Sequence, residues 1–201
     1  MPRFLFVVMF MLISLPAMAK PVILVVGDSI SAGYGIDSSE AWVALLQKKL
    51  IKIKSPYSIS NASISGETSE GGLVRIIPLL ATDDPDIVLL QLGANDGLRG
   101  LSPVKMKNNL AEIIQRSQKS GAKVILLGMK IPPNYGKRYV DMFYNVYPQL
   151  AKELNIPLVP FLLEDVALNK DLMQADGLHP NVKAQAILAE KIEPYLFPLI
   201  K

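Results

Sequence analysis

Short apolar runs alternate with amphipathic stretches along most of this chain, and no other feature of the sequence constrains its fold as strongly. Such short, largely apolar runs are typical of buried parallel strands. They occupy Val22–Val26, Tyr57–Ser60, Ile87–Gln91, Val124–Leu127 and Leu158–Pro160. Because parallel strands are joined by helical crossovers, the alternation predicts an α/β fold with a parallel sheet covered on both faces.

The stretches between the apolar runs carry signals of helix starts and ends. Ser39 is the expected N-cap of the first helix. Ser102 followed by Pro103 is typical of a helix N-cap and first turn, and Gly121 is typical of the end of the same helix. The predicted helices cover residues 41–50, 103–120, 139–154 and 180–195.

Residues 1–19 have the composition of a secretory signal peptide. One arginine precedes an apolar run over residues 4–15, and an Ala-x-Ala cleavage site ends at Ala19. A membrane-spanning helix is the alternative, but it needs about 20 apolar residues and this run is shorter. We therefore expect cleavage after Ala19 and export to the periplasm or the medium. Residues 20–201, which no linker or low-complexity tract divides, are expected to form one domain.

The charge balance and the cysteine content exclude several classes of protein and site. The chain has 21 Lys and Arg against 18 Asp and Glu, and its formal net charge is +3. A nucleic-acid-binding protein would concentrate basic residues, whereas these charges are interspersed. The chain contains no cysteine. This excludes disulfides, thiolate catalysis, thiolate metal sites and a lipid-modified cysteine anchor.

Polar clusters follow four of the apolar runs or precede the last predicted helix. In open parallel sheets, ligands bind outside the carboxyl ends of the strands. The clusters are Gly27–Ser29, Asn61–Thr68, Gly93–Gly97 and Asp176–His179. We therefore expect these segments, which are far apart in the sequence, to meet at one edge of the sheet.

The residue types in these clusters are those that acyl transfer requires. Ser29 lies on a glycine-flanked turn after a strand and is the candidate nucleophile. His179 is the only histidine of the chain and the candidate base, and Asp176, three residues earlier, is the candidate group that orients it. The alternatives are an ordinary strand-to-loop turn at Ser29, a surface or core histidine, and an Asp176 that caps the final helix.

An oxyanion would need hydrogen-bond donors that point to one place. The candidates are the backbone N–H groups of Ser29 and Gly66 and the side-chain amide of Asn95. Gly66 has no Cβ, so a substrate can approach its backbone closely. A plain turn glycine and an Asx-turn asparagine are the alternatives for Gly66 and Asn95. For Asp28 we favour a structural role, in which its carboxylate fastens the serine turn to neighbouring backbone.

These segments resemble the four sequence blocks of the SGNH, or Gly-Asp-Ser-Leu-type, hydrolases. The blocks correspond to Ser29, Gly66, Asn95 and His179, with Asp176 completing an Asp-x-x-His motif. Isoleucine follows Gly-Asp-Ser where leucine is usual, and Gly-Ala-Asn replaces Gly-Gly-Asn. Both departures keep the functional atoms.

More narrowly, three segments are similar to those of the bacterial periplasmic thioesterase I, lysophospholipase and arylesterase group. They are Asn61–Ser69, Gly93–Gly100 and Pro133–Tyr139. The resemblance implies a three-layer α/β/α, flavodoxin-like fold with five parallel strands. It also implies that neither a metal nor an organic cofactor is needed.

The resemblance implies an exported serine esterase that hydrolyses acyl esters and thioesters through an acyl-enzyme. Its expected partner is a small-molecule ester or thioester, without nucleic acid or stable membrane insertion, and we expect a monomer. A carbohydrate O-deacetylase and a non-catalytic glycan- or lipid-binding module are the alternatives. A nucleotide-binding protein is disfavoured, because Gly33-Tyr34-Gly35 does not form the glycine-rich phosphate motif.

Two loops after the strands are expected to form an acyl groove. They cover Gly97–Leu101 and Ile131–Tyr139. The apolar contacts expected from them are Leu98, Leu101, Ile131 and Tyr135. Three loop glycines are expected to let the groove adjust to its ligand: Gly97, Gly100 and Gly136. The alternative is that both loops are ordinary connections without substrate contact.

Overall fold

Five parallel strands lie at the centre of the computed structural model, which describes residues 20–200. The strands are β1 (Val22–Gly27), β2 (Ser58–Asn61), β3 (Ile87–Gln91), β4 (Lys123–Leu127) and β5 (Leu158–Val159). Their order across the sheet is β2-β1-β3-β4-β5, and every neighbouring pair is parallel. This is the flavodoxin-like order of doubly wound sheets. The predicted fold class is confirmed.

The hydrophobicity of each strand follows its place in the sheet. β3 is buried at all five positions, and in β1 only Val22 is partly exposed, because these strands are covered on both faces. A strand covered in this way needs an apolar side chain at nearly every position, which explains the continuous apolar runs. The edge strand β2 is only partly buried and contains serines.

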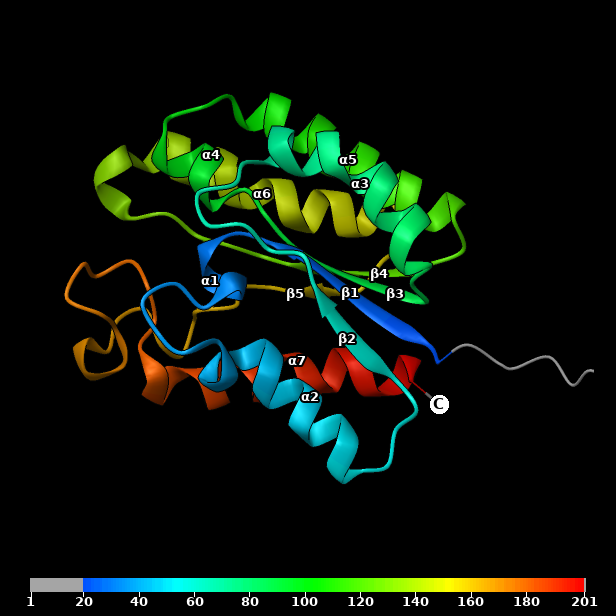
Figure 1. Ribbon diagram of the computed structural model, residues 1–201. Helices are drawn as coiled ribbons and strands as arrows, with labels where there is room; N and C mark the ends of the chain where they lie inside the picture. Colours follow the sequence, from blue (N-terminus) through cyan, green and yellow to red (C-terminus); the bar gives the residue numbers. More distant parts are fainter. Residues whose placement is uncertain (1–19, 201) are drawn as a thin grey trace, which may run out of the picture.

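Helices cover both faces of the sheet (Figure 1). In Figure 1, α3, α5 and α6 lie on one side of the sheet and α2 and α7 on the other, whereas α1 and α4 are short and lie at one end. The helices are α1 (Ser29–Ala32), α2 (Trp42–Lys52), α3 (Ser69–Asp83), α4 (Ala94–Leu98), α5 (Pro103–Lys119), α6 (Lys137–Glu153) and α7 (Gln185–Leu196). Within residues 20–200, no helix is both long and apolar enough to cross a bilayer.

The predicted ends of α5 are confirmed. The Ser102 hydroxyl oxygen accepts the N–H of Lys105 at 3.4 Å, and Pro103 is the first helical residue. Gly121 follows the helix with a φ of 99°, a left-handed conformation that glycine adopts without steric cost.

Two predicted helix starts are wrong. Ser39 does not cap α2, because it lies inside a separate 3-10 turn that Asp37 caps. Pro180 does not open the last helix, which begins at Gln185 after a 3-10 turn over Val182–Ala184. Instead, Pro180 forms an antiparallel bridge with Met173. This pairing keeps the chain extended where the prediction expected a first helical turn.

The helix α3 has no counterpart among the predicted helices. It contains Gly71, Gly72 and Pro78, residue types that disfavour a helix interior. Packing explains Gly72, since a Cβ there would lie 2.3 Å from a methyl carbon of Leu92. The glycine therefore lets α3 approach the segment after β3, and tertiary contact overrides weak helix propensity.

Asp28 joins β1 to the short helix α1. Its carboxylate accepts the N–H of Ile30 at 3.0 Å, so Asp28 is the N-cap of the helix whose first residue is Ser29. The side-chain oxygen of Gln91 in β3 accepts the Asp28 N–H at 3.3 Å and the Ser31 hydroxyl at 2.7 Å. The predicted structural role of Asp28 is thus confirmed.

Asp28 is completely buried, and this burial raises the pKa of its carboxyl from 3.8 to about 6, against the opposing hydrogen bond from Ile30. The folded protein therefore keeps a proton on Asp28 at pH values where the unfolded chain has released it. Consequently, Asp28 lowers the free energy of unfolding as the pH rises from about 4 to about 6.

We predict that Asp28→Asn raises the free energy of unfolding at pH 7, because asparagine keeps a capping oxygen without a buried charge. The shift from 3.8 to about 6 corresponds to about 3 kcal/mol. Urea unfolding of both proteins should show this gain at pH 7 and a much smaller one near pH 4.

Asp37→Asn is the matched control with the opposite sign. Asp37 also caps a short helix, but the hydrogen bonds from Ser39 lower the pKa of its carboxyl. Its charge therefore favours folding above its unfolded pKa, and Asp37→Asn should destabilise the protein at pH 7. An Asp28→Asn protein that loses stability at pH 7 would contradict the prediction.

Candidate active site

The candidate residues lie where the strand order of the sheet reverses. β2 lies on one side of β1 and β3 on the other, so the connections from β1 and β3 leave a crevice between them. Ser29 begins the helix directly after β1, and Asn95 lies in α4, directly after β3. In Figure 1, α1 and α4 lie at the same end of the sheet.

Ser29, His179 and Asp176 form a continuous hydrogen-bonded chain. The His179 Nε2 lies 2.9 Å from the Ser29 Oγ, and the His179 Nδ1 lies 2.7 Å from a carboxylate oxygen of Asp176. A carboxylate beside Nδ1 favours the tautomer with the proton on Nδ1. Nε2 then carries a lone pair that can accept the serine proton.

A tight loop brings Asp176 and His179 together. The Gln174 N–H donates to the carbonyl oxygen of His179 at 2.8 Å, which closes the loop at its base. Gly177, at its tip, has a φ of 66°. The Gln174 side chain donates to the carbonyl oxygen of Tyr34 at 2.7 Å, so the loop is also attached to the segment after α1.

The same loop keeps Asp176 ionised. Partial burial opposes its ionisation, but hydrogen bonds from the His179 backbone and imidazole and from the Leu178 backbone outweigh it. Together they lower the pKa of Asp176 from 3.8 to about 2. The carboxylate is therefore charged at neutral pH and can stabilise a protonated imidazole.

Tyr34 packs on His179 and was not among the predicted site residues. The two ring centroids are 4.6 Å apart, with an angle of 39° between the ring planes. Such a contact limits the orientations that the imidazole ring can adopt. The signal in the sequence that could have identified it is Gly33-Tyr34-Gly35. Both glycines have a positive φ in the structure, so the tyrosine between them lies on a bent segment.

Asn95, in α4, contacts the loop after β2 that contains Gly66. The Asn95 side-chain amide donates to the carbonyl oxygen of Glu67 at 3.0 Å and approaches a carboxylate oxygen of Asp28 at 3.4 Å. Its side chain thus reaches across to the loop after β2 instead of forming an Asx-turn. Gly66 has a φ of 79°, and its carbonyl oxygen accepts from Arg99 at 2.8 Å.

A cavity of about 170 Å³ adjoins Ser29 and His179. Of the four residues predicted for the acyl groove, Leu98 and Ile131 line this cavity, whereas Leu101 and Tyr135 lie outside its lining and are exposed. The remaining lining residues are Asp28, Ile30, Ala94, Asn95, Met129, Lys130, Pro132, Leu163 and Leu178.

Tyrosine hydroxyls hold the two predicted loops together. The Tyr135 hydroxyl donates to the carbonyl oxygen of Leu98 at 2.8 Å, and the Tyr139 hydroxyl donates to that of Leu101 at 2.7 Å. The expectation that Gly97 provides loop flexibility is wrong. Gly97 lies within α4, and a Cβ there would lie 2.6 Å from Ile131, so close packing requires the glycine.

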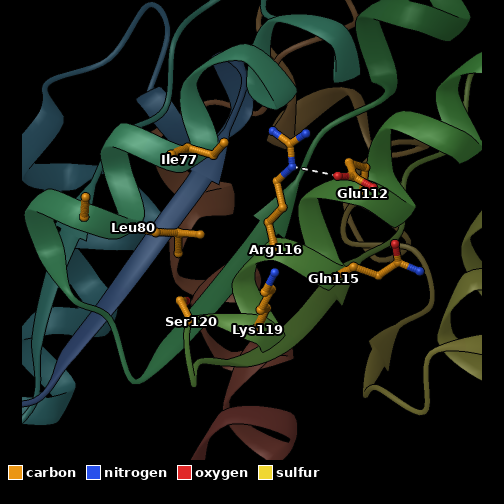
Figure 2. Close-up of a pocket in the computed structure, with 8 residues that line it drawn as sticks. Ile77, Leu80, Glu112, Gln115, Arg116, Lys119 and Ser120 are labelled. Atoms are coloured by element: carbon orange, nitrogen blue, oxygen red, sulfur yellow. Dashed lines mark hydrogen bonds and ion pairs between the residues drawn. The ribbon is translucent and has the colours of Figure 1, made fainter.

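A more open groove of about 670 Å³ lies between α3 and α5 (Figure 2). Ile77 and Leu80 come from α3, and Figure 2 shows Arg116 of α5 paired with Glu112. Its one serine is Ser120, whose hydroxyl donates to a backbone oxygen, and the only histidine of the chain lies at the other cavity. The groove therefore lacks the pair of groups that activates a serine.

Comparisons with known proteins identify the family of this chain. Residues 25–187 match the GDSL-like Lipase/Acylhydrolase family. The chain is 50% identical to Esterase TesA of Pseudomonas aeruginosa over 182 residues, 90% of each chain. It is 44% identical to Thioesterase 1/protease 1/lysophospholipase L1 of Escherichia coli K12 over 197 residues, which cover 98% of this chain and 92% of the relative.

A solved structure shows the same fold. The crystal structure of TesA superposes with a TM-score of 0.87 at 51% identity, covering 89% of this chain and 99% of that one. The family match spans the segments that contain Ser29, Gly66, Asn95, Asp176 and His179. This chain therefore belongs to the GDSL-like lipase/acylhydrolase family and is an acyl-ester hydrolase.

Proposed function

We propose that Ser29 is the nucleophile of a serine esterase that acts on both acyl esters and thioesters. The observation that carries the proposal is the chain of contacts from Ser29 through His179 to Asp176, at 2.9 and 2.7 Å. His179 takes the proton of Ser29 as the hydroxyl oxygen attacks the acyl carbonyl. The imidazolium, stabilised by Asp176, then protonates the leaving alcohol or thiol.

The second half of the reaction uses the same residues. Water attacks the acyl-enzyme, His179 accepts its proton, and the acid leaves with Ser29 restored. In both halves, the N–H groups of Ser29 and Gly66 and the amide of Asn95 stabilise the oxyanion. The 3.4 Å contact between Asn95 and Asp28 is long for a hydrogen bond, so an oxyanion can replace it at small cost.

The breadth of the substrate range is supported by the relatives, whose names include esterase, thioesterase and lysophospholipase. A carbohydrate O-deacetylase is the competing function. Hydrolysis of p-nitrophenyl esters from acetyl to palmitoyl separates the two, because activity on acetyl esters alone indicates a deacetylase. A protein that leaves acyl thioesters intact would contradict the proposed range.

We predict that Ser29→Ala abolishes ester and thioester hydrolysis while the circular dichroism spectrum stays unchanged. Asp176→Asn should lower kcat by about 10⁴-fold, because the substituted amide cannot hold the proton on Nδ1 of the imidazole. Ser120→Ala, which removes a hydroxyl that lines the distant groove, is the matched control and should keep full activity. Full activity in the Ser29→Ala protein would refute the proposed nucleophile.

For the acyl groove, we propose that Leu98 and Ile131 hold the first carbons of the acyl chain and that Leu101 and Tyr135 extend the groove at its exposed rim. Cavity lining by Leu98 and Ile131 supports the first part. The hydrogen bond from the Tyr135 hydroxyl to the carbonyl oxygen of Leu98 supports the second part, because it joins the exposed rim to a residue that lines the cavity.

We predict that Leu98→Ser compresses the preference for long over short acyl chains, since each buried methylene contributes about 0.8 kcal/mol. Leu101→Ser should lower kcat/KM for the longest chains only. Leu168→Ser is the control, because Leu168 is 96% exposed and lies outside the lining of this cavity. A chain-length profile that Leu98→Ser leaves unchanged would place the groove elsewhere.

We also propose that residues 1–19 are a signal peptide and that the enzyme works as an exported monomer. Residues 1–19 lie outside the described residues, so the sequence alone supports the signal peptide. Every proposed catalytic group comes from one chain, so the proposed reaction needs no second copy. Intact-mass analysis of the periplasmic fraction should detect a chain that begins at Lys20, and gel filtration should give the mass of one chain. Protein that keeps residues 1–19 in the membrane fraction would contradict export.

A further inference from the structure

The loop that contains Gly66 is held by side chains of a single short segment. Arg99 and Asn95 donate to the carbonyl oxygens of Gly66 and Glu67, at 2.8 and 3.0 Å. Both donors belong to α4 or to the residue that caps its end. Gly66 and Asn95, the two proposed oxyanion donors outside α1, therefore lie in two segments that contact each other directly.

A third contact between these segments is buried. One carboxylate oxygen of Asp96 in α4 accepts the N–H of Ser69 at 2.8 Å, and the other accepts the Ser69 hydroxyl at 2.6 Å. Asn109 of α5 donates to the same hydroxyl oxygen at 3.0 Å. Asp96, Ser69 and Asn109 are 4%, 0% and 9% exposed.

The position of this carboxylate suits its charge. Ser69 is the first residue of α3, and the positive end of a helix dipole stabilises an anion placed there. Among the described residues, no basic side chain forms an ion pair with Asp96. Hydrogen bonds and the start of α3 must therefore offset the cost of burying the charge.

The contact between Asp96 and Ser69 lies close along the chain to both proposed oxyanion donors, the Asn95 amide and the Gly66 N–H. Asp96 is adjacent to Asn95 in α4, and Ser69 follows Gly66 by three residues. A movement of α4 away from α3 would separate the Asn95 amide from the Gly66 N–H. Oxyanion stabilisation depends on donors that stay within hydrogen-bond distance of one point.

We infer that Asp96 is a positioning residue that sets the spacing of the two oxyanion donors by holding Ser69 at the start of α3. The inference rests on the proposed function. Asp96 itself does not touch the substrate. The carboxylate matters because its two oxygens accept from both the N–H and the hydroxyl of Ser69, whereas an isosteric amide presents only one accepting oxygen.

The test compares steady-state kinetics of Asp96→Asn with the unaltered protein on p-nitrophenyl esters. We expect kcat to fall by about 10–100-fold with KM within about twofold, because a small misplacement of donors weakens only the transition state. The effect should shrink in an Asn95→Ala background, since residues that act as a unit are not additive. Ser69→Ala should lower kcat in the same way if Asp96→Asn does not fold.

Ser60→Ala is the matched control. The Ser60 hydroxyl donates to the Asp83 carboxylate at 2.9 Å at the opposite end of α3, so this variant loses a similar bond far from the site. It should lose stability in urea but keep kcat. If Asp96→Asn or Ser69→Ala also loses only stability, or loses kcat equally with and without Asn95, the inference is overturned. An active Ser29→Ala protein would instead refute the proposed function.

Discussion

The pairing of β1 with β3 is the constraint on which the rest of this structure depends. The two strands are adjacent, parallel and almost wholly buried, although β2 lies between them in the sequence. Their carboxyl ends therefore meet, and the connections that follow diverge to different parts of the fold. Ser29 and Asn95 lie within a few residues of these strand ends, so the sheet brings them to the same edge before any side-chain contact is made.

Two buried carboxylates hold the connections that leave this sheet edge. Asp28 caps the helix that begins at Ser29, and Asp96 holds α4 to the start of α3. Each is buried without a basic partner among the ion pairs of the described residues. Burying a charge in this way lowers stability, as the raised pKa of Asp28 indicates. We propose that the placement of the serine and of the Asn95 amide is the corresponding gain.

The accuracy of the sequence-based expectations follows the range of the interactions involved. The strands were predictable because full burial leaves a run of apolar residues. The cap at Ser102 was predictable because it is made within one turn of its own helix. α3 was not, because Gly72 is required by the distant Leu92. The start of α7 was misplaced because Pro180 pairs with Met173 instead of entering a helix.

The sequence by itself determined the fold class, the family and the candidate residues Ser29, Asp176 and His179, because these depend on composition and on motifs a few residues long. Only the tertiary structure decided that Tyr34 packs on His179 and that Asp96 connects α4 to α3. It also decided that Leu98 and Ile131, but not Leu101 and Tyr135, line the cavity. Such contacts join segments that are distant along the chain, and their distances depend on how helices of different length pack on the sheet. No local pattern of residues records that packing.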